Sequence, residues 1–268
     1  MGRIEEALKH ARREKPGRSA VPITEGIEPE FNIDFSKLPV MVPDEDVLEK
    51  FRVVAAMKDA PERTAYKVLR TRVLQRLRAS QFNVIGVTGA GPGEGKTLTA
   101  INFAYSLAQD VNHRVILLDL DLRRPSVHEY LGISPPKDLS NLLDGNARLE
   151  DVLICPNANR LAVATCQTPV RDSSEKLSSP EMASIIHQLR AMGQKTITVV
   201  DLPPVLASDD VIAISPLVDA LLLVVGQGRC RREDLRESQE LLKEAEILGV
   251  VLNRSREKSA KAGYYDYY

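Results

Sequence analysis

The most constraining feature of this 268-residue sequence is an apolar run that leads into a glycine-rich loop and then into a helical pattern. The run Val84–Thr88 has the length and composition of a buried strand. Residues 89–97 then read Gly-Ala-Gly-Pro-Gly-Glu-Gly-Lys-Thr, and apolar residues follow at helical spacing, namely Ile101, Ala104, Leu107 and Ala108. A strand, a glycine-rich loop ending in Gly-Lys-Thr and a helix, in this order, are typical of a phosphate-binding P-loop.

The residue types of this loop match the chemistry of a nucleotide site. Glycines at 91, 93 and 95 let the backbone turn closely, so that successive N–H groups and the helix dipole face phosphate oxygens. Lys96 is placed to neutralise the outer phosphates, and the Thr97 hydroxyl is placed to bind Mg²⁺. Ala90 departs from the strict motif, which has glycine there, and alanine fits this position if its φ stays negative. The loop therefore predicts binding of ATP with Mg²⁺.

Carboxylates follow two further apolar runs. Val115–Leu118 leads into Asp119 and Asp121, and Thr196–Val200 leads into Asp201. Ligands bind at the carboxyl ends of parallel strands, where carboxylate oxygens hold Mg²⁺ or its waters. One aspartate after a strand is often a helix cap or a turn residue. Three of them at two strand ends, together with the P-loop, indicate a metal-assisted phosphate site.

The pattern from about residue 61 onwards predicts the fold class. Short apolar runs occur at Val84–Thr88, Val115–Leu118, Leu161–Ala164, Thr196–Val200, Leu221–Val225 and Val250–Leu252. Helical patterns alternate with them at Glu62–Ser80, Thr97–Gln109, Pro180–Met192 and Arg232–Glu246. Runs without polar alternation suit strands that are covered on both faces by crossover helices. We therefore expect an α/β domain at residues 61–253 with a doubly wound, mostly parallel sheet of the P-loop NTPase type.

The two ends of the chain differ from this pattern. Residues 1–60 contain a short helical pattern followed by five prolines and little hydrophobic periodicity, which predicts an extension that is largely disordered after its helix. That helix either docks on a partner or stays solvated. Residues 254–268 are predicted to form a flexible tail. Four of the seven tyrosines lie there, at Tyr264, Tyr265, Tyr267 and Tyr268.

Composition excludes several classes of protein. The formal net charge of −1 gives no general reason to expect nucleic acid or an anionic membrane as a partner. The three cysteines are widely spaced and suggest neither a zinc site nor disulfides. No run approaches the roughly 18–20 apolar residues that span a bilayer, and the charged start of the chain differs from a secretory signal. We therefore expect a cytoplasmic protein without direct membrane insertion.

Three motifs in combination resemble the bacterial tyrosine kinases, whose relatives regulate capsule and exopolysaccharide export. They are Pro92–Thr97, LLDLDLRRP at 117–125 and VVDLPPVLASDD at 199–210, and the similarity covers about residues 62–268. The resemblance implies ATP-dependent autophosphorylation of the tyrosine tail, with Asp119 as proton acceptor and Asp121 and Asp201 supporting Mg²⁺. An aromatic adhesive segment is the other interpretation of the tail. The implied nucleotide contacts are Gly91, Pro92, Gly93, Glu94, Gly95, Lys96, Thr97, Leu98 and Asn253.

The resemblance also implies partners. An inner-membrane chain-length (co-polymerase) protein would activate the kinase and recruit it to the inner face of the membrane, and a phosphotyrosine phosphatase would oppose it. Self-association is implied too, with a neighbouring subunit presenting the tail. The helix used for subunit contacts departs from the family pattern of an acid and two arginines, because Thr64, Lys67 and Arg70 stand there. Lysine does not replace arginine in a bidentate pair, so self-association is left open.

Three other functions share features of this sequence. A partitioning-type ATPase carries an additional lysine at the position of Gly91, and a GTPase would have an aspartate where Arg256 stands. A regulatory scaffold that binds nucleotide without phosphorylating a protein is also compatible with the motifs. For Arg123 and Arg124 the sequence leaves three roles open: charge stabilisation during transfer, a subunit contact, or solvent exposure.

Overall fold

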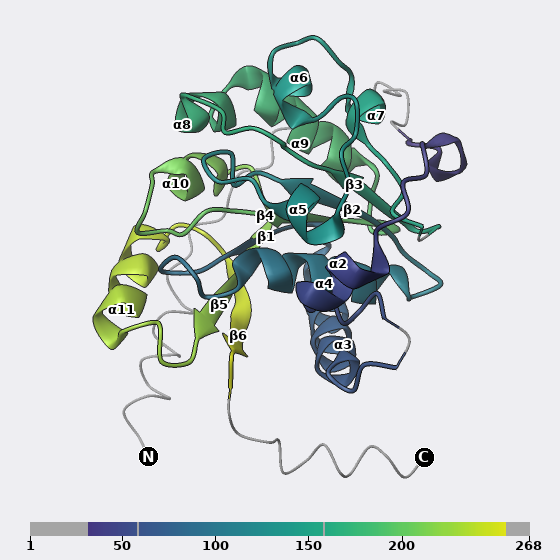
Figure 1. The fold of residues 1–268 in the computed structure, drawn as a ribbon. Coiled ribbons are helices and arrows are strands. Elements are labelled where there is room, and N and C mark those ends of the chain that lie inside the picture. Colours follow the sequence, from purple (N-terminus) through teal and green to yellow (C-terminus); the bar gives the residue numbers. More distant parts are fainter. Residues whose placement is uncertain (1–31, 58, 158, 256–268) are drawn as a thin grey trace. The chain divides into compact units, whose positions relative to one another are not determined.

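The computed structural model describes residues 32–57, 59–157 and 159–255, and these contain one parallel sheet flanked by helices (Figure 1). The strands of this described part are β1 (Val84–Thr88), β2 (Arg114–Asp119), β3 (Leu161–Ala164), β4 (Thr196–Asp201), β5 (Ala220–Gly226) and β6 (Ile247–Asn253). Their order is β3-β2-β4-β1-β5-β6, and all neighbouring pairs are parallel. The predicted doubly wound sheet is confirmed.

Strand β1 lies in the interior of the sheet, between β4 and β5. Every residue of β1, β3 and β4 is buried, as expected for strands that are covered on both faces. The chain moves from β1 to β2 on one side and later from β4 across β1 to β5 on the other. This reversal of direction opens a crevice beyond the carboxyl end of β1, where open α/β sheets bind their ligands.

Helices cover both faces of the sheet (Figure 1). Helices α3 (Arg63–Ser80) and α4 (Lys96–Ala108) pack on the face that contains Ile85 and Val87. The opposite face packs against α8 (Ser173–Leu177), α9 (Pro180–Ala191) and α10 (Asp210–Ile214). The remaining elements are η1 (Phe35–Lys37), α2 (Glu45–Lys50), α5 (Val127–Leu131), α6 (Leu139–Leu143), α7 (Leu149–Val152) and α11 (Arg232–Leu241).

Each of the four helices predicted for the domain has an observed counterpart with closely matching ends, except the last one, and the structure adds short helices that were not predicted. The pattern expected to continue to Glu246 ends at Leu241, because residues 242–246 turn into β6. Helix α11 also contributes little to the core, with Ser238 as its buried residue. Amphipathic spacing alone does not reveal where a helix must stop for the next strand to join the sheet.

Residues 33–56 differ from the predicted extension because they pack against the domain. Ile33, Phe35 and Leu38 join the core on one face, and Leu48 and Val53 join it on the other. The Asn102 side chain accepts a hydrogen bond from the Ala55 N–H at 2.7 Å and donates one to the Arg52 carbonyl. Residues 33–56 therefore belong to the packed domain, whereas the predicted helix at the start of the chain lies outside the described residues. The sequence did not reveal this packing, because a segment that follows the surface of a domain shows no regular hydrophobic period.

Within the described residues, no helix is both long and apolar enough to cross a membrane. Cys155, Cys166 and Cys230 are free thiols in the described part of the chain. Of the altered subunit-contact positions, Arg70 donates a hydrogen bond to the Ser106 carbonyl at 2.8 Å, while Thr64 and Lys67 are exposed. Arg70 therefore holds α3 against α4 within one chain.

Candidate active site

The glycine-rich loop connects β1 to α4 at the crevice. Gly93 and Gly95 have positive φ values of 72° and 89°, which explains the need for glycine at these two positions. Ala90 does not have a positive φ, so alanine is accommodated at this position, as predicted. The Gly89 and Ala90 carbonyls accept hydrogen bonds from the N–H groups of Val205 and Leu206, which anchor the start of the loop to the segment after β4.

Lys96 opens α4 and points back into the loop. Its ammonium donates a hydrogen bond to the Gly91 carbonyl at 3.2 Å, and the side chain is almost fully buried. Burial lowers the pKa of Lys96, and the charges of Asp201, Asp121 and Glu94 raise it in part. The lysine is thus held inside the loop and faces carboxylates, as expected for a cation that meets nucleotide phosphates.

Glu94 is turned inward, which the sequence did not indicate. It is 1% exposed, and one carboxylate oxygen accepts a hydrogen bond from the Gly91 N–H at 3.2 Å. The other oxygen has no hydrogen-bond partner within the described chain. The Glu94 carboxylate therefore accepts the hydrogen bond of an N–H group that was predicted to bind phosphate. This negative group must move before a nucleotide can use the Gly91 N–H.

Asn253, at the end of β6, holds the loop from outside. Its side-chain amide donates to the Glu94 carbonyl at 2.9 Å. A side chain on Gly95 would overlap this amide, so the close approach requires glycine there. Asn253, Gly95 and Leu98 also line a cavity of about 680 Å³ beside the loop. This volume suits the nucleoside part of a nucleotide.

The three predicted carboxylates meet at the carboxyl ends of β2 and β4. Asp119 and Asp201 are direct register partners on these neighbouring strands, and both are fully buried. Asp121 lies two residues beyond Asp119 and is 9% exposed. The structure therefore brings all three carboxylates together, and the charges of Asp121 and Asp201 act on Lys96.

The free oxygens distinguish these carboxylates. Asp119 accepts hydrogen bonds from the Ser126 and Val127 N–H groups through Oδ2, at 3.1 and 3.0 Å, and Oδ1 has no partner. Asp121 accepts from the Arg124 N–H at 3.2 Å. Neither oxygen of Asp201 accepts a hydrogen bond of ordinary geometry from the described chain. Buried acceptors without donors are costly unless a cation or a proton satisfies them.

Their pKa values follow from this arrangement. Burial and then the Asp121 charge raise the pKa of Asp201 to about 7, although Thr97 and Lys96 lower it. Burial and the Asp201 charge raise the pKa of Asp119 well above its usual range. Burial also raises the pKa of Asp121. The site therefore concentrates negative charge that the protein itself does not neutralise.

The donor set fits a hard divalent cation, but only together with other ligands. Among the described residues, no three His, Cys, Asp or Glu side chains are arranged to hold a metal ion by themselves. Mg²⁺ usually takes one or two carboxylates and completes its octahedral shell with water and substrate phosphates. Thr97, Asp121 and Asp201 offer oxygens of the required kind, and the unpaired oxygens of Asp201 are the observation that supports this fit.

Arg123 connects three segments around the site, a role that the sequence did not reveal. Its guanidinium donates to the Ser173 hydroxyl at 3.0 Å and pairs with Asp209 and Asp210 at 3.1 Å each. Asp210 is fully buried and also accepts from the Ser173 hydroxyl. Arg123 therefore ties the segment after Asp121 to the segment after Asp201. The tail tyrosines Tyr264, Tyr265, Tyr267 and Tyr268 lie outside the described residues.

The sequence is similar to those of known proteins. The family model that matches residues 85–268 is described as the CobQ/CobB/MinD/ParA nucleotide binding domain. Tyrosine-protein kinase YwqD of Bacillus subtilis is 29% identical over 203 residues, covering 75% of this chain and 84% of that protein. Tyrosine-protein kinase CpsD of Streptococcus pneumoniae is 31% identical over 195 residues, covering 70% and 82%. The succinoglycan biosynthesis transport protein ExoP of Rhizobium meliloti is 31% identical over 79% of this chain, which spans 28% of ExoP.

Solved structures agree with these sequence matches. The VpsO kinase domain superposes with a TM-score of 0.65 at 31% identity, covering 77% of this chain and 98% of that domain. The kinase domain of Escherichia coli tyrosine kinase ETK gives 0.67 at 25% identity, covering 82% and 91%. The septum site-determining protein MinD of Pyrococcus horikoshii gives 0.54 at 20% identity, covering 65% and 72%, and shows the shared fold alone. The chain belongs to the CobQ/CobB/MinD/ParA nucleotide-binding domain family and, within it, to the bacterial tyrosine kinases.

Proposed function

We propose that this protein is an ATP-dependent protein-tyrosine autokinase whose acceptors are Tyr264, Tyr265, Tyr267 and Tyr268. One observation carries the proposal: Lys96 of the phosphate loop lies near the charges of Asp201 and Asp121, and Asp201 and its strand neighbour Asp119 retain free oxygens at adjacent strand ends. In this proposal the kinase domain runs from about residue 33 to Asn253, and residues 254–268 form the acceptor tail.

The phosphate loop binds the nucleotide through its backbone and its lysine. Residues 91–97 wrap the phosphates once Glu94 releases the Gly91 N–H. Lys96 then exchanges the Gly91 carbonyl for phosphate oxygens. Leu98 and Asn253 face the nucleoside in the adjoining cavity. Burial makes these charge interactions stronger than they would be in water.

The carboxylates divide the remaining work. Thr97, Asp121 and Asp201 would hold Mg²⁺, which screens the phosphate charge when it is bound. Asp119 accepts the proton of the attacking tyrosine hydroxyl at its free Oδ1, and its raised pKa makes this carboxylate a stronger proton acceptor. The tyrosine oxygen bonds to the γ-phosphorus of ATP, the bond to the β-phosphate oxygen breaks, and ADP leaves.

The biological setting is proposed from the relatives. The name of ExoP places that protein in succinoglycan biosynthesis and transport, so we assign this kinase to the control of exopolysaccharide or capsule polymerisation and export. An inner-membrane co-polymerase would activate it from a separate chain and recruit it from the cytoplasm to the inner face of the membrane. A phosphotyrosine phosphatase would remove the phosphates from the tail. Several phosphates of about −1.5 to −2 charge each would repel one another and the acidic residues of the active site, which opposes return of the modified tail to that site.

The test is incubation of the purified full chain with Mg-ATP, followed by mass spectrometry of its C-terminal peptide. Phosphate on residues 264–268 is expected, and it should disappear in Lys96→Met and in a chain whose four tail tyrosines are phenylalanine. Asp119→Asn should block phosphate transfer while leaving Mg-ADP binding intact, whereas Asp201→Asn should weaken Mg-ADP binding itself. ATP hydrolysis without tail phosphate, even with the cytoplasmic segment of a co-polymerase added, would refute the kinase assignment.

A further inference from the structure

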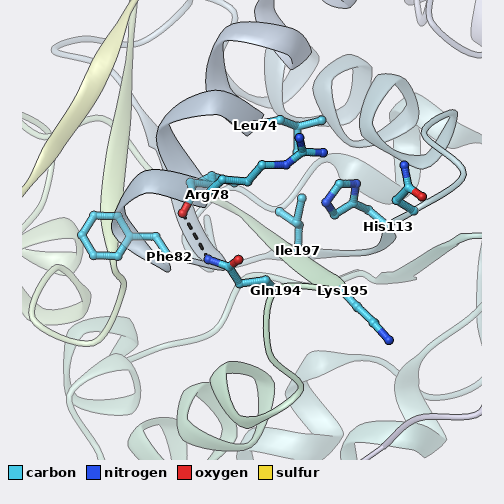
Figure 2. A pocket seen from close by; sticks show the side chains of 9 residues that line it. Leu74, Arg78, Phe82, His113, Gln194, Lys195 and Ile197 are labelled. Carbon is cyan, nitrogen blue, oxygen red and sulfur yellow. Dashed lines mark hydrogen bonds between the residues drawn. The ribbon is translucent and has the colours of Figure 1, made fainter.

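A second pocket lies at the opposite end of the sheet from the phosphate loop (Figure 2). His113 directly precedes β2 and Lys195 directly precedes β4, whereas Asp119 and Asp201 end these strands. Six-residue strands separate the two sites by about 17 Å. The pocket has a volume of about 250 Å³, and α3 forms its other wall through Leu74, Leu77 and Arg78. Nothing in the kinase chemistry described above uses these residues.

Residues with basic side chains line this pocket. Arg78, Lys195 and His113 line it, and no carboxylate does among the described residues. Arg78 and Lys195 are exposed and make no ion pair within the described chain. His113 is nearly buried, and its Nδ1 lies 3.2 Å from an Asp110 oxygen that also accepts the Asn112 N–H. Figure 2 shows the Arg78 guanidinium extending toward the His113 ring, whereas the Lys195 side chain points away from both.

Most of the remaining lining is apolar, and three of these apolar side chains belong to the buried core. Leu74, Leu77 and Ile197 are buried, and Figure 2 shows Leu74 and Ile197 beside the Arg78 and His113 side chains. The Gln194 amide donates to the Leu77 carbonyl at 3.3 Å and closes the pocket between α3 and β4. A ligand for this site therefore combines an anionic group with a compact apolar one. A volume below the roughly 300 Å³ of small-molecule sites suits a single side chain rather than a nucleotide.

We propose that this pocket binds phosphotyrosine. The phosphate would lie between Arg78 and His113, since a guanidinium forms paired hydrogen bonds with phosphate oxygens. The ring would rest on Leu74 and Ile197, where the arginine face adds a cation–π contact. Arginine clusters recur in domains that bind phosphorylated peptides. The assignment rests on the proposed function, because tail phosphorylation supplies the ligand, and it gives the modified tail a binding site on another copy of the chain.

The test measures peptide binding directly, so it needs no kinase activity. A fluorescent peptide of residues 260–268 with phosphate on Tyr265 is titrated into phosphatase-treated full chain under saturating Mg-ADP, and anisotropy is recorded. The unphosphorylated peptide, a phosphotyrosine peptide with unrelated flanks and inorganic phosphate are compared. Arg78→Gln and Lys195→Gln change the pocket, and Arg72→Gln is the matched control, because Arg72 is exposed on the same helix but does not line the pocket.

The expected result is specific for both the phosphate and the ring. Arg78→Gln should weaken binding at least tenfold and Lys195→Gln severalfold, while Arg72→Gln should stay within twofold of the wild type. The unphosphorylated peptide should not bind. A stronger signal for the tail peptide than for the unrelated one identifies the chain's own tail as the source, and equal signals identify phosphotyrosine proteins in general.

Three outcomes would overturn the assignment. The first is equal affinity of wild type, Arg78→Gln and Lys195→Gln. The second is displacement by inorganic phosphate at the concentration of the peptide, which would show that the ring is not recognised. The third is binding of phosphatidylglycerol vesicles with the same dependence on Arg78, which would make the pocket a lipid headgroup site. A chain that binds the peptide but never phosphorylates its tail would instead refute only the proposed kinase function.

Discussion

Replacing Asp201 by asparagine keeps the size of a fully buried side chain and removes its ionisable group. The carboxyl has a reference pKa of 3.8, and burial next to Asp121 raises the pKa to about 7 in the folded chain. Between these values the folded state holds a proton that the unfolded state releases. Stability from this group is therefore complete below pH 3.8 and is lost as the pH rises through about 7.

The size of the effect follows from the same values. Each pKa unit corresponds to about 1.36 kcal/mol, so a rise from 3.8 to about 7 costs about 4 kcal/mol of folding free energy at alkaline pH. Asparagine avoids this cost, but its buried amide also lacks hydrogen-bond partners, which costs about 1–3 kcal/mol. We expect Asp201→Asn to be more stable than the wild type by about 2 kcal/mol at pH 8, and no more stable at pH 4.

The assay is urea unfolding of the nucleotide-free and metal-free protein at pH 4, 6 and 8. Asp219→Asn is the matched control, because Asp219 accepts hydrogen bonds from the Asn83 and Val84 N–H groups and from Arg190. This control should be less stable than the wild type at pH 8. An Asp201→Asn protein that is destabilised at pH 8, or whose stability difference does not change with pH, would refute the reasoning.

Three further changes test other contacts. Gly95→Ala should weaken Mg-ADP binding and lower the free energy of unfolding by about 1–3 kcal/mol, because residue 95 has a positive φ and an added side chain would clash with Asn253. Calorimetry measures the binding and urea unfolding measures the stability. Unchanged binding and stability would contradict the close approach of Asn253 to Gly95. Arg123→Met should cost about 1–3 kcal/mol by leaving the buried Asp210 without its cation, and unchanged unfolding would refute this. Leu48→Ala should cost about 2–5 kcal/mol by thermal unfolding if residues 33–56 belong to the core, whereas a solvated extension would show no change.

The sequence predicted the features of the site that depend on neighbours along the chain. The P-loop needs glycines, a lysine and a threonine at fixed positions between a strand and a helix, and residues 89–97 show them directly. Aspartates after apolar runs marked two strand ends. Parallel strands that end at the same edge of a sheet bring such residues to the ligand-binding edge. What these patterns did not contain was the register that makes Asp119 and Asp201 direct neighbours.

Contacts between distant segments could not be predicted in this way. Glu94 was expected among the phosphate contacts, but its carboxylate binds the Gly91 N–H in place of a phosphate. Arg123 had three open roles until its contacts with Ser173 and Asp210 connected segments that lie 50 or more residues apart. Residues 33–56 lacked periodicity because their apolar side chains fill gaps on two different faces of the domain.

The sequence by itself determined the strand–loop–helix of the phosphate site, the parallel α/β class and the family. These depend on backbone conformation, hydrophobic period and the spacing of a few chemical groups, all of which are local properties. Only the tertiary structure decided which oxygens remain unpaired, which loop N–H is occupied and where cations gather at the far end of the sheet. Burial and hydrogen bonding set these properties, and both depend on what other segments of the chain bring to the same place.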